Sequence, residues 1–501
     1  MKLNGKSRIG LRMHEKRRIG LLVTFLVLSG NLGQAVAALL ADTTFSHDRG
    51  FYTAPLEVTI STETVEASIR YTLDGSDPRT SENATIGSNP CKVTVDPAGT
   101  YGRVATPAVT LRACAFYGGK AISNVDTQTY IFLADVINQE EIKPGGSDVF
   151  WTTSMDPKVT QDPAYESVMP EVMLSIPTVS AVLDWEDLFG TAGIHRGNNL
   201  ARADYEKPCS LELIYPDRPH FAGFEGFQVD CGIRIQGGGG RWDKGLYDHK
   251  QSFGLRFRRQ YGTGTLDYPV FESAPFQAEG EAGKYDSLIL RAGHNKSWGA
   301  TWDNVHTVYT RDQYGRDLQL AMSGIGSRGT FVHLYLNGIY WGLYNLCERP
   351  DHAFSASYLE GTKEDYYSGK RKGGSISGDG TRFEFWRSSV SRTTDFGYLQ
   401  QYLAVDAYID MALLGVFANP GDYPQYYFGN GNNPAGPIYF YQWDLEDSFG
   451  GGSRRSGNPS KSRLGSCYEF NNMWNSNVEF RMRFADRAYI ACYNHGVFTT
   501  E

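Results

Sequence analysis

The chain has 501 residues, a formal net charge of −8 and 41% hydrophobic residues. Its length exceeds what a single hydrophobic core normally organises, which predicts more than one domain. The acidic balance argues against a nucleic-acid partner, because such partners are bound through clustered Lys and Arg side chains. Seven cysteines are too few for a disulfide scaffold and none stands in a CxxC spacing, so a zinc site is not expected.

The first 37 residues have the pattern of a secretory signal peptide. Arg17 and Arg18 precede the apolar run 19–28, and small residues at 35–37 offer a cleavage site. No later segment reaches the roughly 20 apolar residues of a membrane span; an uncleaved N-terminal anchor is the alternative. Removing seven Lys/Arg and one Glu with this segment takes the net charge from −8 to about −14. We therefore expect an acidic protein that is secreted, periplasmic or held at the cell surface.

Residues 43–133 predict a small β-sandwich. Polar and apolar residues alternate over 56–60, 69–73 and 109–116, and turn-forming residues cluster at 74–78, as in short strands joined by tight turns. The string Tyr-Thr-Leu-Asp-Gly-Ser-Asp-Pro at 71–78 resembles the Ig-like module at the C-terminus of chitobiases and β-hexosaminidases. That resemblance implies an accessory unit, which serves as a spacer or contacts polysaccharide.

Residues 134–170, rich in Asp, Pro, Ser and Gly, are interpreted as a linker, and residues 171–501 as an α+β domain without regular βαβ alternation. The pattern predicts strands at 210–215, 227–235, 253–258 and 287–291, a helix at 304–322, a hairpin at 331–344 and a helix at 398–417. The hairpin is the clearest element, because Asn337 and Gly338 supply both residues that a type I′ turn needs.

Cysteine positions allow some disulfides in an exported protein, although the sequence does not establish their connectivity. The plausible local pairs, which leave Cys347 over, are Cys91 with Cys114, Cys209 with Cys231, and Cys467 with Cys492.

An aromatic run at 439–443 is followed at once by Asp444, Glu446 and Asp447. Aromatic runs favour strands in a packed sheet, where ionised carboxylates are costly unless a metal, a cation or several donors compensate them. Alternation along a strand would point Asp444 and Glu446 the same way, whereas a tight turn after Leu445 would bring Asp444 and Asp447 together. Either pair offers oxygen ligands for Mg²⁺ or Mn²⁺; the alternative is a strand end whose acids face water.

Four strings of the second domain, taken in order, resemble the spore coat protein H (CotH) kinase family. They are Cys-Gly-Ile-Arg-Ile-Gln-Gly at 231–237, the segment 249–262, the hairpin at 337–344 with Glu348 and Asp351, and the block at 421–444. The resemblance covers about residues 170–490. It implies an atypical protein-kinase-like fold that binds ATP with Mg²⁺ or Mn²⁺ and phosphorylates Ser or Thr of a secreted or surface protein.

The resemblance assigns nucleotide contacts to three residues. Lys250 would contact the phosphates, Arg234 would supply a second cation, and Glu348 would orient Lys250. The structural alternatives are a surface lysine, a structural ion pair of Arg234, and a pairing of Glu348 with Arg349 or with solvent. The glycines at 237–240 lack the P-loop signature and are more typical of a loop between two strands, although such a loop can cover a nucleotide.

The resemblance also assigns the acidic groups that phosphoryl transfer requires. Asp422 is the expected general base or metal-linked acid, Asp444 the preferred metal ligand and Asp447 its helper, with Glu446 less favoured. This chain departs from the family pattern, since no asparagine follows Asp422 before Asn430, which puts two-metal chemistry in doubt. The chain also ends where relatives usually continue, so we expect a fragment or a domain that lacks its last elements.

Two other functions remain open on the sequence. One is a non-catalytic surface or matrix protein that keeps a kinase-like fold for assembly. The other is a carbohydrate-active or carbohydrate-binding surface protein, suggested by the first module. Glycosidases need two carboxylates at a fixed separation, and no feature of this sequence selects such a pair.

Overall fold

The computed structural model describes residues 41–121, 123–142, 153–195, 205–237, 250–274, 276, 279–293, 307–370, 375–377, 385, 388–420, 427–431, 436–449 and 471–499. All of them belong to one unit that starts at Leu40. None of the helices in these residues is both long and apolar enough to cross a bilayer.

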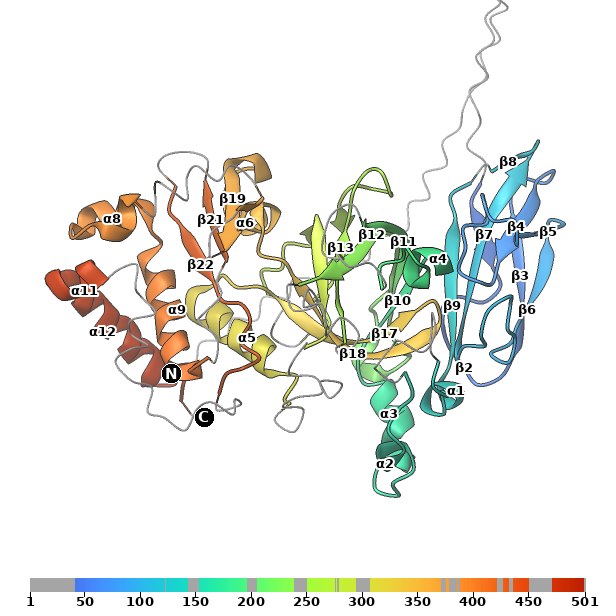
Figure 1. Ribbon diagram of the computed structural model, residues 1–501, viewed down its shortest axis with the longest axis horizontal. Coiled ribbons are helices and arrows are strands. Elements are labelled where there is room, and N and C mark those ends of the chain that lie inside the picture. The colour runs from blue at the N-terminus through green and yellow to red at the C-terminus, as the bar shows by residue number, and fades with distance from the viewer. Residues whose placement is uncertain are drawn as a thin grey trace, which may run out of the picture. The chain divides into compact units, whose positions relative to one another are not determined.

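Two sheets form the N-terminal module (Figure 1). One joins β1 (Thr43–Phe45), β3 (Leu56–Thr62) and β6 (Cys91–Val95); the other joins β2 (Gly50–Tyr52), β9 (Asp126–Phe132), β7 (Ala108–Tyr117), β4 (Ser68–Thr72) and β5 (Thr85–Gly87), with β8 (Lys120–Ala121) beside β7. Alternating residues such as Val58, Ile60, Val93 and Leu111 fill the space between the sheets, as the period of two along a strand requires. The predicted all-β module is confirmed.

Short helices occupy the segment interpreted as a linker. They are α1 (Leu133–Ile137), α2 (Pro157–Thr160), η1 (Glu166–Val168) and α3 (Met169–Met173). Val136 and Met173 pack in one apolar cluster with Ile131 of β9 and Tyr335. The start of this segment at α1 and its end at α3 are therefore packed against neighbouring elements, whereas α2 has no buried residue.

A closed barrel follows, in the order β10 (Thr178–Val182), β11 (Lys207–Ile214), β12 (Phe227–Gln236), β13 (Ser252–Arg256), β16 (Ser287–Arg291), β18 (Ile339–Glu348) and β17 (Gly329–Leu336). Short elements at its ends are α4 (Trp185–Phe189), η3 (Pro219–Phe221), β14 (Leu266–Asp267) and β15 (Lys284–Tyr285). Leu288, Leu290 and Leu346 belong to the apolar cluster of the barrel. Because side chains alternate along a strand, Ser287, Ile289 and Arg291 lie on the other face of β16.

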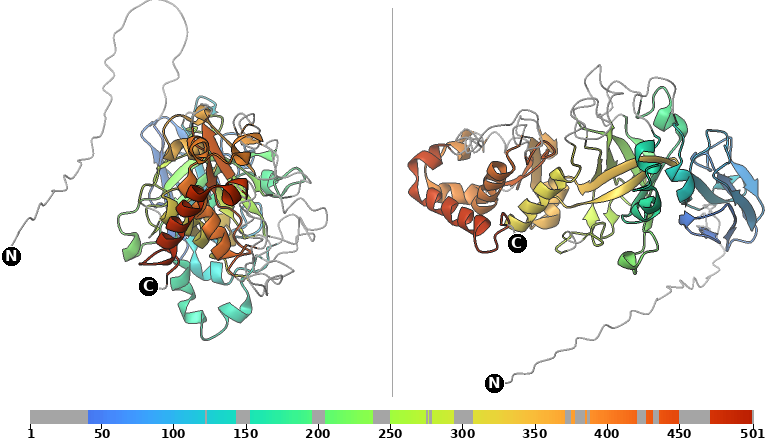
Figure 2. Two further views of the ribbon diagram at one scale, coloured as in Figure 1. Left: turned by 90° about the vertical axis from the view of Figure 1, so that its left-hand side faces the viewer. Right: turned by 90° about the horizontal axis from the view of Figure 1, so that it is seen from below.

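Part of the remaining chain packs against that face, where Ile289 lies in one apolar cluster with Phe354 and Trp443. The helices of the remaining chain are α5 (Arg311–Ser323), α6 (His352–Tyr358), η7 (Lys363–Asp365), η8 (Val390–Arg392), α8 (Phe396–Tyr402), α9 (Val405–Ala418), α11 (Asn471–Ser476) and α12 (Val478–Cys492). A four-stranded sheet joins β20 (Ser375–Ser377), β19 (Tyr366–Lys370), β21 (Tyr427–Gly431) and β22 (Tyr439–Tyr441). Helix α9 lies against both α5 and α12 (Figures 1 and 2). The predicted α+β class of this domain is confirmed.

Two predicted helices have different limits in the structure. The helix expected from residue 304 begins at Arg311, and the helix expected at 398–417 is divided into α8 and α9. The division is caused by a contact that is distant in sequence: the amide of Ala404 donates to Ile438 O, and the amide of Ile438 donates to Tyr402 O. Pairing with the strand that leads into β22 replaces helical hydrogen bonds at this point, and periodicity alone does not reveal such a partner.

The predicted type I′ hairpin is confirmed and also docks the N-terminal module. Asn337 and Gly338 have φ values of 46° and 81°. The Asn337 side chain exchanges two hydrogen bonds with the backbone of Leu183, of 2.7 and 2.8 Å. The amide of Ala108, in the module, donates to Gly338 O at 3.1 Å, and Arg103 donates to Asn337 O at 2.6 Å. A two-residue turn thus joins barrel and module.

Six cysteines that the structure describes are free thiols: Cys91, Cys114, Cys209, Cys231, Cys347 and Cys492. Cys209 and Cys231 stand directly opposite each other on β11 and β12. Cys467 lies outside the described residues.

Candidate functional site

Arg291, the last residue of β16, lies among three carboxylates that come from two distant parts of the chain. Its Nε is 3.1 Å from Asp312 Oδ2 on α5. Its terminal nitrogens donate to Asp444 Oδ1 at 3.0 and 3.1 Å and to Glu446 Oε2 at 3.1 Å. We call Arg291, Asp312, Asp444 and Glu446 the Arg291 cluster. It joins the barrel to α5 and to the segment after β22.

Contacts from α5 hold the segment that carries two of these acids. The side chain of Gln319 donates to Phe440 O at 2.8 Å and accepts from the amide of Gln442 at 2.7 Å. Asp312 accepts from the amide of Leu445 at 2.9 Å. Leu445 packs so closely on α5 that a Cβ on Gly315 would lie 2.0 Å from Leu445 Cδ1. The acids are therefore fixed by backbone contacts and not only by their charges.

Trp443 and a second arginine complete the surroundings. The guanidinium of Arg291 lies 4.6 Å from the centre of the Trp443 ring and that of Arg316 lies 5.5 Å from it, within cation–π range. Arg316 is fully buried and is 3.2 Å from Asp312 Oδ2. Asp444 has a φ of 60°, a left-handed conformation that is uncommon for residues other than glycine.

Electrostatics show an excess of negative charge in the cluster. Burial alone would lower the pKa of Arg291, but attraction to Asp312, Glu446 and Asp444 raises it well above its ordinary value. Arg291 and Arg316 lower the pKa of Asp312 against the effect of burial. Burial, followed by repulsion from Asp444, raises the pKa of Glu446 to about 8. Three carboxylates face two guanidiniums, so near neutral pH the cluster retains a proton or accommodates another cation.

A small hollow opens beside this cluster, lined by Arg291, Gly293, Tyr309, Asn345 and Glu446 among others. Acids beside a fixed cation are the arrangement that protein kinases use to hold a nucleotide and its metal. Comparison with known families gives a separate finding: residues 249–498 match the family described as CotH kinase protein.

The second part of the chain is a CotH domain.

A second match covers residues 47–127, to the family described as chitobiase/beta-hexosaminidase C-terminal domain. Both resemblances inferred from the sequence are therefore confirmed. A comparison with curated proteins found no match. Every residue of the Arg291 cluster lies inside the CotH match, whereas Arg234 precedes it.

Lys250 lies at the start of the CotH domain but outside the Arg291 cluster. Its ammonium donates to Leu343 O at 2.5 Å and lies 4.2 Å from the centre of the Tyr344 ring. Burial lowers the pKa of Lys250 to about 7. The Lys250 ammonium is also 5.7 Å from the ring centre of Tyr309, a residue that lines the hollow beside Arg291. Lys250 therefore adjoins the candidate site and is not a surface lysine.

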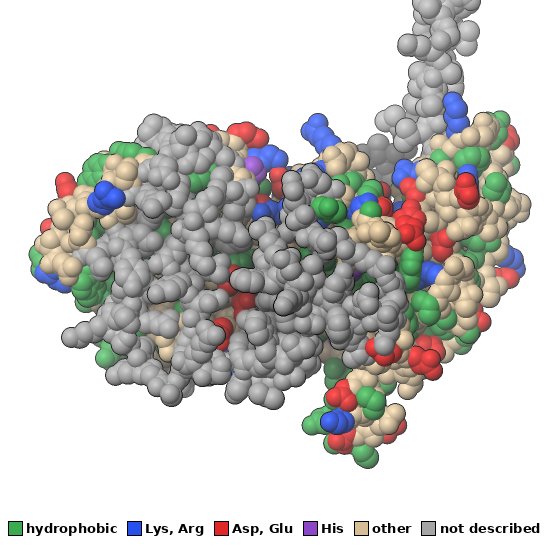
Figure 3. All heavy atoms as spheres, in the orientation of Figure 1, with side chains coloured by type: hydrophobic (Ala, Val, Ile, Leu, Met, Phe, Trp, Pro, Cys, Tyr) green, Lys and Arg blue, Asp and Glu red, His purple; other side chains and the backbone are tan. Residues whose placement is uncertain are grey.

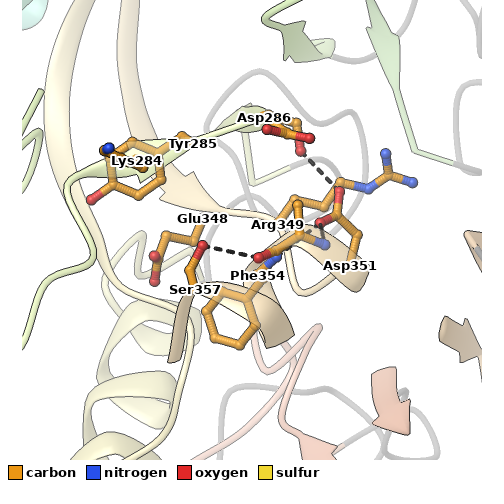
Figure 4. Close-up of a pocket in the computed structure, with 10 residues that line it drawn as sticks. Lys284, Tyr285, Asp286, Glu348, Arg349, Asp351, Phe354 and Ser357 are labelled. Atoms are coloured by element: carbon orange, nitrogen blue, oxygen red, sulfur yellow. Dashed lines mark hydrogen bonds between the residues drawn. The ribbon is translucent and has the colours of Figure 1, made fainter. Parts of the chain in front are cut away.

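The expected pairing of Glu348 with Lys250 is wrong, because the two side chains have other partners. Glu348 accepts from the amide of Arg328 at 2.8 Å and from the hydroxyl of Tyr358 at 2.5 Å. Burial raises the pKa of Glu348 to about 7. Glu348 also does not pair with Arg349, since the two side chains point in opposite directions where β18 ends (Figure 4). Alternation along the end of β18 accounts for this.

Arg234 is 3.8 Å from Glu206, so the structural ion pair is present. It lies on β12, outside the Arg291 cluster. Asp422 lies outside the described residues, as do three of the four glycines at 237–240, so their roles stay predictions.

The carboxylates after β22 are arranged differently from the favoured expectation. The strand ends at Tyr441, earlier than the aromatic run suggests, and Asp444 shares Arg291 with Glu446, the acid that the sequence interpretation ranked below Asp447. The role of Asp447 as a helper ligand stays a prediction.

Sequence reasoning missed Arg291, Asp312 and Arg316. Arg291 ends a strand that was predicted, and Asp312 lies in a helix that was predicted. Only the tertiary contact between α5 and the end of β16 brings Arg291 and Asp312 together, and no local pattern specifies that contact.

Proposed function

We propose that the CotH domain transfers the γ-phosphoryl group of ATP to a Ser or Thr hydroxyl of a protein. The observation that carries this proposal is the ion pair between Arg291 on a barrel strand and Asp312 on α5, with Asp444 on the same guanidinium. Protein kinases use a cation on the phosphates, an acid on a neighbouring helix that holds this cation, and a carboxylate for the metal. The Arg291 cluster supplies all three groups.

A divalent metal fits the residues present. Asp444 and Glu446 offer hard oxygen ligands, and the excess negative charge of the cluster is compensated by an added cation. Among the described residues, no group of three or more His, Cys, Asp and Glu side chains is placed to hold a metal ion alone. This suits Mg²⁺ or Mn²⁺ in a nucleotide site, where one or two carboxylates act together with substrate phosphates. A bound metal would neutralise charge on the phosphates.

Individual residues of the chain have separate roles in the proposed reaction. Arg291 holds a phosphate oxygen, and Asp312, itself paired with Arg316, keeps Arg291 in place. Lys250, 5.7 Å from the ring centre of Tyr309, supplies a second cation. Asp422 is the proposed base that accepts the proton of the acceptor hydroxyl. The signal-peptide pattern at 1–37 supports export, so we propose a secreted or cell-surface protein as substrate.

Calorimetry on the intact protein tests this function directly. We expect ATP to bind in the presence of Mg²⁺ or Mn²⁺ and to bind much more weakly without metal. Asp444→Asn should abolish the metal-dependent part, because the amide keeps the shape of the side chain but loses the ligand charge. Asp406→Asn is the matched control, since Asp406 forms an exposed ion pair with Arg483. Equal ATP binding by both variants would overturn the assignment of Asp444.

A test of transfer follows from binding. Incubation with ATP and secreted proteins of the same cell, followed by mass spectrometry, should find phosphorylated Ser or Thr that depends on Asp444 and Asp422. A protein that binds ATP without transferring phosphate to any protein would favour the non-catalytic assembly role instead.

We also infer that the N-terminal module contacts polysaccharide. Asp74, Asn83 and Arg103 of the module line a hollow of about 530 Å³ together with Trp185, a mixture of polar groups and an aromatic side chain that suits a sugar. Pull-down of the intact protein on insoluble chitin or cellulose, beside an Asn83→Ala variant, tests this; no retention on either polymer would exclude it.

A further inference from the structure

A third hollow, of about 630 Å³, lies at the end of β16 away from Arg291. Five arginines, Lys363 and His352 line it, with only Asp286 and Asp351 as acids. Figure 3 shows Lys and Arg side chains, with a histidine, gathered between α6 and the end of β13. We call this hollow the arginine pocket.

Strand register places its central residues side by side. Arg256 on β13 is directly opposite Ser287 on β16, and Arg349 follows Glu348, which is opposite Leu288. On the other side, Arg256 is opposite Gly232, two residues before Arg234 on β12. Two neighbouring strands and the segment after β18 thus bring three guanidiniums to one face, a convergence that no local segment of the sequence shows.

The acids near the pocket are already engaged by other groups. Asp286 pairs with Lys363 at 2.6 Å. Asp351 caps α6 by accepting from the amides of Ala353 and Phe354 and accepts from the Ser287 hydroxyl at 3.0 Å. Glu206 lies between Arg258, at 3.2 Å, and Arg234, at 3.8 Å. Positive charge therefore exceeds negative charge in the pocket.

Arg256 is the group least compensated. It is 4% exposed, and its hydrogen bonds go to Leu255 O at 3.0 Å and to Gln236 Oε1 at 3.2 Å, both uncharged. The Nε atoms of Arg234 and Arg349 are buried without a hydrogen-bond partner among the described residues. Burial lowers the pKa of Arg256 well below its ordinary value, and repulsion from Arg349 and Arg234 adds to this effect. Buried guanidiniums without a paired carboxylate are costly, and a bound anion would compensate their charge.

We propose that the arginine pocket binds a phosphate-class oxyanion and that it does so independently of the Arg291 cluster. Arginine recognises phosphate oxygens through paired, charge-assisted hydrogen bonds, and Arg234, Arg256 and Arg349 surround one space. Ser287 and Arg291 lie on the same face of β16, four residues and therefore about 13 Å apart. The pocket is thus a second anion site, separate from the place where Asp444 acts.

Titration of the intact protein with inorganic phosphate, without metal or nucleotide, tests this proposal. We expect saturable binding by calorimetry and a rise in melting temperature with phosphate concentration. Arg349→Gln should weaken binding at least about tenfold, the cost of one charge-assisted hydrogen bond. Lys92→Gln, at an exposed ion pair of the module, should leave binding unchanged. Arg259→Gln provides a second pocket variant should Arg349→Gln fold poorly.

Three results bear on the outcome. Phosphate binding that survives Asp444→Asn while metal-dependent ATP binding is lost supports a separate site and keeps this test independent of the proposed function. Displacement of phosphate by AMP identifies a nucleotide as the source of the phosphate group, whereas no displacement identifies a free phosphate; both support the site. Weak, unsaturable binding that is equal in all variants means an adventitious ion only and overturns the proposal.

Discussion

Arg291 Nε lies 3.1 Å from Asp312 Oδ2, so an ion pair ties the last residue of a barrel strand to the first turn of helix α5. Asp444 and Glu446 approach the same guanidinium from the segment after β22. One side chain therefore connects three parts of the domain: β16, α5 and the segment after β22.

Arg291→Met should lower the free energy of unfolding by about 3–5 kcal/mol, because it leaves buried carboxylates without their cation. Urea denaturation measures the change. Lys92→Gln is the control, since the Lys92–Glu57 pair is exposed and such pairs contribute at most about 1 kcal/mol. In the Arg291→Met background, Asp444→Asn should recover part of the loss. A loss no larger than that of the control would contradict the structural role assigned to Arg291.

Gly315→Ala should destabilise the CotH domain although alanine is the better helix former. The added methyl would lie 2.0 Å from Leu445 Cδ1, so α5 and the segment carrying Asp444 must separate. The matched substitution is Gly415→Ala in α9, where no atom lies within 4 Å of the added methyl; it should stabilise by about 0.5–1 kcal/mol. Thermal unfolding of both variants should move in opposite directions, and movement in the same direction would count against the close packing of Leu445.

Stability should depend on pH through Glu348. Its pKa is raised to about 7 in the folded protein from about 4.3 in an unfolded chain, so between these values the folded state binds more protons. The free energy of unfolding therefore falls as pH rises from about 4.5 to about 7. Glu348→Gln keeps a neutral acceptor for Arg328 and Tyr358 and should remove this part of the dependence. Parallel pH profiles for the two proteins would show that Glu348 is ionised throughout.

Gly338→Ala should loosen the attachment of the N-terminal module. Gly338 has a φ of 81°, and a Cβ there would lie 2.0 Å from Ala108 O. Gly118→Ala is the control, because Gly118 also has a positive φ but no atom within 4 Å of the added methyl. Limited proteolysis should cut the first variant faster between module and barrel. Equal cutting of both variants would mean that only backbone strain matters.

Sequence patterns predicted those parts of the fold that local interactions specify. The Asn337–Gly338 turn was predicted because its conformation depends on two adjacent residues, and the N-terminal strands because alternation is local. The division between α8 and α9 was not predicted, since it depends on pairing with Ile438. Closure of seven strands into a barrel has no local signature either, because β10 pairs in parallel with β17, about 150 residues later.

The candidate site was predicted only in part for the same reason. The run that leads into Asp444 could be recognised from the sequence, because carboxylates directly follow aromatic residues there. Arg291 and Asp312 gave no such signal, because each is an ordinary charged residue within its own strand or helix. Lys250 was selected by resemblance, and the structure places it beside the site instead of at the centre of the cluster.

The hairpin turn at Asn337 and Gly338 has a consequence for the architecture of the whole chain. A turn that only reverses direction tolerates changes at its exposed edge, whereas this one also accepts the amide of Ala108 and the guanidinium of Arg103. Deleting residues 43–133 would strip the turn of both donors and uncover Tyr335, which packs in one cluster with Ala108 and Ile131. The module therefore covers part of the barrel surface. A module transferred to another protein would need the same Asn-Gly turn in that protein to dock in this way.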